Sequence, residues 1–327
     1  MLSGNRNLAV DLMKGIGILL VIIEHNDLLA LNYYLKNSIC SFHMPLFFIL
    51  SGFFFRPSID IESRIRRDFN RLLVPYFFIM FLLVLYTIIV HIFIHHDYWS
   101  TYSTLWMVLY PTGLKNSFIA NSCPIWFLIA LFWSRTIMNV FFVKFHNLSW
   151  ILLFVLSVLS YIIYNFTFLD LPFAFFQGVS VLIFLLVGYS LNFFDFKYKG
   201  RLRMIIFSTF CVFMWLLSVY YANLNTMICK YDNYLISIIG ACGATFIIYL
   251  VSLFLSHRNY LISKVLLWFG YNSMIVLCVH TLERYIPFWR ILFPNPYLVL
   301  LMEFIICFLV TLVCYKFKIT RSIFCLK

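Results

Sequence analysis

Long apolar stretches follow one another at short intervals through almost the whole of this chain. Each is close to the length of about 20 apolar residues that a helix needs to cross the hydrocarbon core of a bilayer. Backbone polar groups in a bilayer must be bonded within the chain, which leaves helices and closed barrels as spanning structures. Barrel strands alternate apolar and polar residues, whereas these stretches are continuously apolar. The pattern therefore predicts an all-α integral membrane protein.

The composition supports this class, because 64% of the residues are hydrophobic and only 11% are charged, too few for the charged shell of a soluble domain. The lengths of the apolar stretches, and the polar residues that separate them, predict a bundle of about ten transmembrane helices. These helices form a single polytopic membrane domain over residues 1–327. The second expected span is short, so its start is expected to dip into the bundle. The expected spans centre on residues 10–30, 42–56, 72–94, 124–144, 149–167, 173–194, 204–222, 235–255, 266–286 and 297–316.

The net charge of +12 predicts orientation in a bilayer rather than a nucleic-acid partner, because Lys and Arg collect in cytoplasmic loops. If the N-terminus is cytoplasmic, most of these cations fall in inner segments, and the excess of Lys and Arg recurs in successive inner loops. We therefore expect a multi-pass protein of the inner (plasma) membrane with both termini in the cytoplasm. Arg135 falls inside a span. The expected outer segments carry only Lys36, Lys115, Lys230, Arg284 and Arg290.

The nine cysteines predict no metal centre, because no pair has metal-ligand spacing and no CxxC motif occurs. Most lie inside apolar runs, where cysteine behaves as a small hydrophobic residue. Cys40, Cys123 and Cys229 fall on expected outer segments, and a disulfide among them remains open. No cleavable signal peptide is expected, because the first apolar stretch is interrupted by charged groups.

The first stretch carries Asp11, Lys14, Glu24 and His25, and ionisable groups within a span are functional candidates by default. Lys14 and His25 are eleven residues apart, which places them on nearly the same helix face, roughly 16 Å apart along the axis. Asp11 lies one turn before Lys14 and can pair with it. A helix end with snorkelling side chains also fits Asp11 and Lys14. It fits His25 less well, because an uninterrupted apolar run precedes it.

Three further groups of residues are candidates for chemistry. His43 opens the second stretch, and the small residues Ser51 and Gly52 within it permit close helix packing. Ser273 and His280 share a face of the ninth span, and the expected topology puts His25, His43 and His280 at similar depth in its outer half. A cluster of arginines suits phosphate recognition, although a purely topological role remains open. These are Arg64, Arg67 and Arg71.

The chain also contains the runs Arg71-Leu72-Leu73-Val74-Pro75-Tyr76, Trp126-Phe127-Leu128 and Asn272-Ser273. Together with Asp11, Lys14, Gly15 and His25, with Phe42 to Gly52 and with His280, these motifs resemble the type 3 acyltransferases, especially the fucose O-acetylase-like branch. The resemblance implies about ten helices, acetyl-CoA as the acyl donor, and a sugar or polysaccharide hydroxyl as the acceptor. Lys14 stands where many members have arginine, and Glu24 stands where a small residue is frequent.

The resemblance and the residue chemistry predict acyl transfer to a hydroxyl, with His25 as general base and a transient acyl-histidine as a variant. Lys14 is expected to orient the donor or to stabilise developing negative charge. His280 and Ser273 are expected to orient His25 or the acceptor. The arginine cluster is expected to hold the phosphates of coenzyme A. Accompanying roles are expected for Asp11, Glu24, His43 and Asn272.

Two other functions fit a polytopic membrane protein. A flippase or transporter of lipid-linked sugars would also carry buried charge, but it predicts half-repeats with broken helices, and none is found. A polysaccharide polymerase is expected to have a large outer loop, and the longest expected outer segment, residues 95–122, is modest.

Overall fold

The computed structural model describes residues 7–26, 32–90, 98–113, 123–167, 169, 171–193, 200–258, 260–286, 292–293 and 295–325. Strands in this part of the chain are limited to β1 (Leu224–Asn225) and β2 (Lys230–Tyr231), which pair antiparallel in a small hairpin. The all-α class is therefore confirmed. Two of the expected outer cations, Lys115 and Arg290, lie outside the described residues.

Helices follow one another along the described parts of the chain. The first part holds α1 (Leu8–Glu24), α2 (Tyr33–Cys40), α3 (His43–Phe53), α4 (Ile61–Asp68), the π-helix η2 (Phe69–Leu73), α5 (Val74–Thr87) and α6 (Tyr98–Leu109). The middle holds α7 (Trp126–Phe145), α8 (Ser149–Phe166), α9 (Phe175–Ser180), α10 (Leu182–Ser190) and α11 (Arg201–Tyr221). The last part holds α12 (Tyr234–Ser256), α13 (Leu261–Tyr271), α14 (Ser273–Tyr285), α16 (Pro296–Cys314) and α17 (Lys318–Ile323).

Every expected span contains helix, but the number of about ten spans is not confirmed. Among the described residues, six helical stretches are long and apolar enough to cross a bilayer, or seven if α13 and α14, which meet at 79°, form one broken span. The 17 residues of α1 fall just short of that length. The 11 residues of α3 rise about 16 Å, half of the hydrocarbon core. The stretch Trp126–Phe166 joins α7 to α8 at His146, which has a positive φ of 47°.

The outer surface of the bundle is apolar. On α11, for example, Ile206, Phe210, Phe213 and Leu216 are all exposed. Exposed apolar faces of this extent are costly in water and are the surface that lipid tails require. The fold is therefore that of a multi-pass membrane protein.

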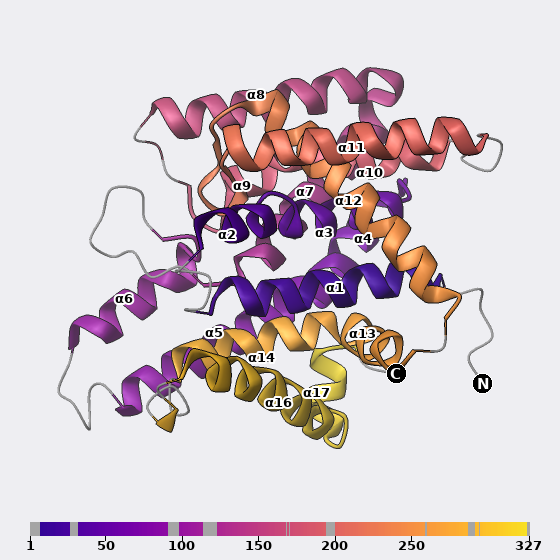
Figure 1. Ribbon diagram of the computed structural model, residues 1–327. Helices are drawn as coiled ribbons and strands as arrows, with labels where there is room; N and C mark the ends of the chain where they lie inside the picture. The colour runs from indigo at the N-terminus through magenta and orange to yellow at the C-terminus, as the bar shows by residue number, and fades with distance from the viewer. Residues whose placement is uncertain are drawn as a thin grey trace.

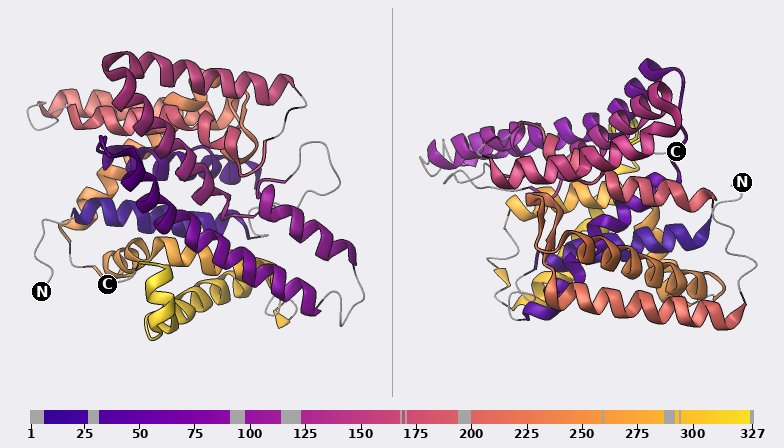
Figure 2. Two further views of the ribbon diagram at one scale, coloured as in Figure 1. Left: turned by 180° about the vertical axis from the view of Figure 1, so that it is seen from behind. Right: turned by 90° about the horizontal axis from the view of Figure 1, so that it is seen from above.

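Helix α1 lies in the interior of the bundle, between α12 on one side and α13 and α14 on the other (Figures 1 and 2). Its polar residues therefore face protein rather than lipid, as the cost of intramembrane charge requires. In Figure 1, α1 begins and α16 ends on the right, so these two ends lie on the same side of the bundle. The end of α1 and the start of α3 lie together at the left, opposite α4.

Glycines allow α1 to pack directly against α13. A Cβ atom on Gly15 would lie 2.0 Å from the carbonyl oxygen of Leu266, and one on Gly270 would lie 1.8 Å from the carbonyl oxygen of Asp11. Both distances are far below van der Waals contact, so no other residue fits without moving a helix. The glycines therefore fix the position of the helix that carries Lys14.

Glycines also allow α3 to pack closely against α10, which confirms the expected role of Gly52 in close packing. A Cβ atom on Gly52 would lie 2.1 Å from the carbonyl oxygen of Leu185, and one on Gly188 would lie 1.9 Å from that of Ile49. Helix α3 is thus held rigidly although it is too short to span the bilayer by itself.

All nine cysteines are free thiols. The disulfide that remained open among Cys40, Cys123 and Cys229 is therefore not formed. Cys123 and Cys229 are fully buried, and Cys40 lies 3.5 Å from a carboxylate oxygen of Glu24.

Candidate active site between the ends of three helices

Helix α1 carries the candidate base at its C-terminal end. The helix is capped at its start by Asn7, whose side-chain oxygen accepts hydrogen bonds from the backbone N–H groups of Ala9 (3.1 Å) and Val10 (3.4 Å). The apolar residues that follow extend it to Glu24 and His25. The Asn7 cap therefore fixes the start of α1. The length of the helix then places the Glu24 carboxylate and the His25 imidazole at its C-terminal end.

The contacts of His25 select one tautomer of its ring. Its Nδ1 atom lies 2.8 Å from the carbonyl oxygen of Val21 and 3.2 Å from Oε2 of Glu24. A carbonyl oxygen only accepts hydrogen bonds, so Nδ1 carries the proton and donates it. The other nitrogen, Nε2, is then left as a proton acceptor, the form that a general base requires.

Glu24 connects two histidines from different helices. Its Oε2 atom lies 3.2 Å from Nδ1 of His25 and 3.6 Å from Nε2 of His43, which opens α3. The Nδ1 atom of His43 donates a hydrogen bond to the carbonyl of Ile39 (2.9 Å), which fixes this ring as well. A carboxylate beside an imidazole orients the ring and stabilises its protonated form.

His280, on α14, completes the group. Its ring meets that of His25 edge to face, with centroids 5.4 Å apart and planes inclined by 67°. The His280 side chain is fully buried, and its Nδ1 atom lies 3.5 Å from Oε2 of Glu283. The structure thus brings together the three histidines that the sequence placed at similar depth.

An apolar cavity of about 170 Å³ lies next to this histidine group. Val21, one turn before His25, and Leu277, one turn before His280, both line it. Leu72 of η2 lines it too, and among the described residues Ser273 is the one polar side chain in its lining. The cavity therefore joins the surroundings of the histidines to the segment that carries the arginine cluster.

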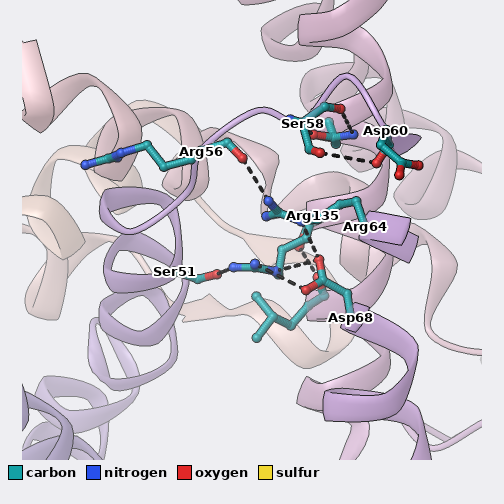
Figure 3. A network of polar contacts seen from close by, with 10 residues as sticks. Ser51, Arg56, Ser58, Asp60, Arg64, Asp68 and Arg135 are labelled. Carbon is teal, nitrogen blue, oxygen red and sulfur yellow. Dashed lines mark hydrogen bonds and ion pairs between the residues drawn. The ribbon is translucent and has the colours of Figure 1, made fainter. Parts of the chain in front are cut away.

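Arg64 lies inside the bundle and not on its surface. Its Nε atom donates to Asp68 (3.0 Å), its Nη1 atom donates to the carbonyl of Arg56 (2.8 Å), and its guanidinium packs over the ring of Phe55 at 4.6 Å. Figure 3 shows the hydrogen bonds of Arg64 with Asp68 and Arg56. A buried guanidinium that is held in this way contributes to the fold, whereas Arg67 and Arg71 are exposed. Of the three arginines grouped as phosphate ligands, only two are therefore accessible.

Arg135 was not singled out as a site residue from the sequence, although a lone cation inside an apolar helix is a recognisable signal. Its Nε atom donates to Asp68 Oδ2 (3.1 Å), its Nη2 atom to Asp68 Oδ1 (3.3 Å) and its Nη1 atom to the hydroxyl of Ser51 (2.9 Å). Asp68 therefore holds Arg64 and Arg135 together, and this network ties α3, α4 and α7 to one another (Figure 3).

The segment with the exposed arginines has a defined start and an unusual continuation. Asp60 caps α4 by accepting hydrogen bonds from the backbone N–H (3.0 Å) and the hydroxyl (2.6 Å) of Ser63. These hydrogen bonds lower the pKa of the Asp60 carboxyl. The chain continues into the π-helix η2, a feature often found at functional sites. In η2, Arg71 is exposed while Leu72 is buried against the cavity.

Lys14 and Asp11 lie towards the opposite end of α1 from His25. The Nζ atom of Lys14 is 3.5 Å from a carboxylate oxygen of Asp11 and 5.8 Å from the ring centroid of Phe54. The expected pair is therefore confirmed, with Asp11 buried and Lys14 partly exposed. Because roughly 16 Å separate Lys14 from His25 along the helix, the two side chains serve different parts of the site.

Asn272 occupies the bend between α13 and α14. Its side-chain N–H donates to the carbonyl of Trp268 (2.8 Å), and its side-chain oxygen accepts from the hydroxyl of Tyr315 (2.6 Å). Asn272 therefore stabilises the 79° break, while the next residue, Ser273, lines the cavity.

The bundle, its inward-facing ionisable groups and its proton-accepting imidazole define a multi-pass membrane enzyme. Residues 7–317, nearly the whole chain, match the family described as an acyltransferase domain, and the chain belongs to this type 3 acyltransferase family. It is therefore a membrane acyltransferase. No curated protein and no solved structure matches the sequence.

Proposed function

We propose that the protein transfers an acetyl group from acetyl-CoA to a hydroxyl of a sugar, in a surface polysaccharide or its lipid-linked precursor, as expected for the fucose O-acetylase-like branch. The observation that carries this proposal is the double contact of His25 Nδ1 with Val21 and Glu24. It favours the tautomer whose Nε2 accepts a proton, and a sugar hydroxyl must lose a proton in order to attack a thioester.

The reaction proceeds by direct transfer. The acceptor hydroxyl gives its proton to His25 Nε2 while its oxygen forms a bond to the thioester carbonyl carbon. The carbon–sulfur bond then breaks, and the thiolate of coenzyme A takes the proton back from the imidazolium. Glu24 stabilises the imidazolium between these steps, and His280 and His43 hold the base and the carboxylate in position.

The donor enters from the side of the arginine cluster. Arg67 and Arg71 are exposed and suit charge-assisted hydrogen bonds to the phosphates of coenzyme A. The apolar cavity, from Leu72 to Val21, suits the arm that carries the thioester. Arg64 acts indirectly, through the Asp68 network. Lys14 orients the donor, because its distance from His25 excludes contact with the reacting carbonyl.

This arrangement and the distribution of Lys and Arg support the following orientation. Both termini and the arginine cluster lie on the cytoplasmic side of the plasma membrane, and the histidines lie in the outer half. Exposed Lys230 on β2 is then external, whereas exposed Arg258 after α12 is cytoplasmic. In a Cys325→Ser background, an impermeant thiol reagent should label Lys230→Cys in intact cells and Arg258→Cys only after permeabilisation. The reverse pattern would invert the topology.

Membranes that contain the protein, incubated with labelled acetyl-CoA and a polysaccharide extract, test the proposed reaction. Alkali-labile label should appear in the glycan fraction, and octanoyl-CoA should compete poorly if the donor is acetyl-CoA. A lipid-linked sugar extract in a parallel sample distinguishes the two acceptors. Absence of label in both fractions, with the protein present at normal level, would contradict the proposed substrates.

A further inference from the structure

A second group of ligand-type side chains lies beside the histidines, between α14 and α16. His280, Glu283 and Cys307 are all buried, and the nitrogen, oxygen and sulfur atoms that they offer lie within 4.8 Å of one another. We propose that these three residues bind a divalent transition-metal ion of the zinc class. The sequence predicted no metal because no two cysteines have metal-ligand spacing, whereas these ligands come from two helices.

The distances between the ligand atoms suit such an ion. His280 Nδ1 and Glu283 Oε2 are 3.5 Å apart, and Glu283 Oε2 and Cys307 Sγ are 4.0 Å apart. Tetrahedral zinc, with bonds of about 2.0–2.3 Å, separates its ligand atoms by roughly 3.3–3.6 Å. Small side-chain rotations therefore bring all three atoms into coordination distance without moving the helices.

The donor types favour zinc over the common alkaline-earth cations. Imidazole nitrogen, thiolate sulfur and carboxylate oxygen are the three protein donors that zinc binds. Calcium and magnesium take oxygen ligands and do not select thiolate. Three protein donors also leave one tetrahedral position for a water or a substrate oxygen.

The helices present these donors as a preformed site. His280 and Glu283 are three residues apart, so they lie on one face of α14, and Cys307 approaches from the neighbouring α16. Glu303, one turn before Cys307, accepts a hydrogen bond from the side chain of Asn26 (3.2 Å) and so ties α16 to the chain just after His25. A divalent cation offsets the cost of holding a carboxylate and a thiolate in an apolar interior.

Metal binding would fix the ring of His280, and that ring contacts the ring of His25. A bound metal ion would therefore help to position His25, the base, through His280. The proposal does not depend on the identity of the acyl donor or acceptor, because it rests only on the ligand geometry.

The test is metal content and spectroscopy of the full chain, purified in detergent without chelators. About one zinc-class ion per chain is expected by elemental analysis. Replacement by Co²⁺ should give a near-ultraviolet sulfur-to-cobalt charge-transfer band. Cys307→Ala should lose this band, and Glu283→Gln should weaken metal binding by at least about tenfold. Cys314→Ala, another buried cysteine on α16 outside the cluster, is the matched control and should keep both signals.

Two results would overturn the proposal. One is the absence of both bound metal and a Co²⁺ band in monodisperse wild-type protein. The other is metal binding that is equal in wild type, Cys307→Ala and Glu283→Gln. Neither readout requires acetylation, so failure of the metal site and failure of the proposed reaction are distinguishable. If Cys307→Ala does not fold, the wild-type Co²⁺ spectrum and Glu283→Gln still decide.

Discussion

The carboxylate of Glu24, at the end of α1, lies 3.6 Å from Nε2 of His43, at the start of α3. The same oxygen lies 3.2 Å from Nδ1 of His25, so one carboxylate connects two imidazoles from two helices. This arrangement gives a role to the residue that departs from the usual family pattern. We propose that Glu24 orients the base and stabilises its protonated form.

Glu24→Gln keeps the size of the side chain and one accepting oxygen but removes its charge. We expect turnover to fall on the order of 10²-fold, because the imidazolium loses its stabilising carboxylate, while the apparent KM for acetyl-CoA stays nearly constant. Steady-state kinetics in membranes of equal protein content measure both values. Glu62→Gln, on the exposed face of α4, is the control. Turnover equal to that of the control would remove Glu24 from the reaction.

Much of the fold followed from the sequence because the bilayer constrains it strongly. Every expected span contains helix, and the ion pair of Asp11 and Lys14 is present. The number of spans was not confirmed, because apolar length cannot distinguish a spanning helix from short ones such as α3 or from the bent pair α13 and α14.

The candidate site was predicted only in its parts. His25, His43 and His280 were each recognisable as polar groups in apolar stretches, but their convergence depends on how α1, α3 and α14 pack. Arg64 and Arg67 looked equivalent in the sequence. In the structure, Arg64 is buried and paired with Asp68, whereas Arg67 is exposed. Residues three apart lie near each other on a helix, so helical spacing does not distinguish these two arginines, and only the tertiary contacts of α4 show which guanidinium is held inside the bundle.

The exposed arginines should affect the donor and not the acceptor. Arg67→Ala and Arg71→Ala should each raise the apparent KM for acetyl-CoA roughly tenfold, equivalent to the loss of about 1.4 kcal/mol from a charge-assisted hydrogen bond. The apparent KM for the glycan should change little. Arg258→Ala, an exposed arginine elsewhere, serves as the reference. Donor kinetics unchanged in both variants would leave these arginines a topological role alone.

Asp68 should be important for stability. Asp68→Ala leaves the buried guanidinium of Arg64 and the largely buried one of Arg135 without their carboxylate. Breaking a buried ion pair at one partner costs about 3–5 kcal/mol, so a marked drop in the midpoint of thermal unfolding in detergent is expected. Asp232→Ala, which removes an exposed ion pair with Lys230, should shift it little. Equal effects of the two substitutions would contradict the structural role of the network.

The close contact between α1 and α13 can be tested by a glycine-to-alanine substitution, which adds one methyl group to the interface. In Gly270→Ala, the new Cβ would lie 1.8 Å from the carbonyl oxygen of Asp11, so α13 must move. We expect a destabilisation of about 1–3 kcal/mol and lower yield of folded protein. Gly200→Ala is the matched control, because its Cβ meets nothing within 4 Å. Normal thermal stability of Gly270→Ala would show that the two helices do not approach as closely as described.

We propose a reaction in which His25 accepts the proton of the acceptor hydroxyl. Its most direct test is the rate of acetyl transfer by His25→Gln, measured with labelled acetyl-CoA in membranes of equal protein content, beside His257→Gln, an exposed histidine at the end of α12. Glutamine replaces one hydrogen bond but accepts no proton, so turnover should fall by at least about 10²-fold while His257→Gln stays near wild type. Near-normal acetylation by a well-inserted His25→Gln protein would show that His25 is not the base.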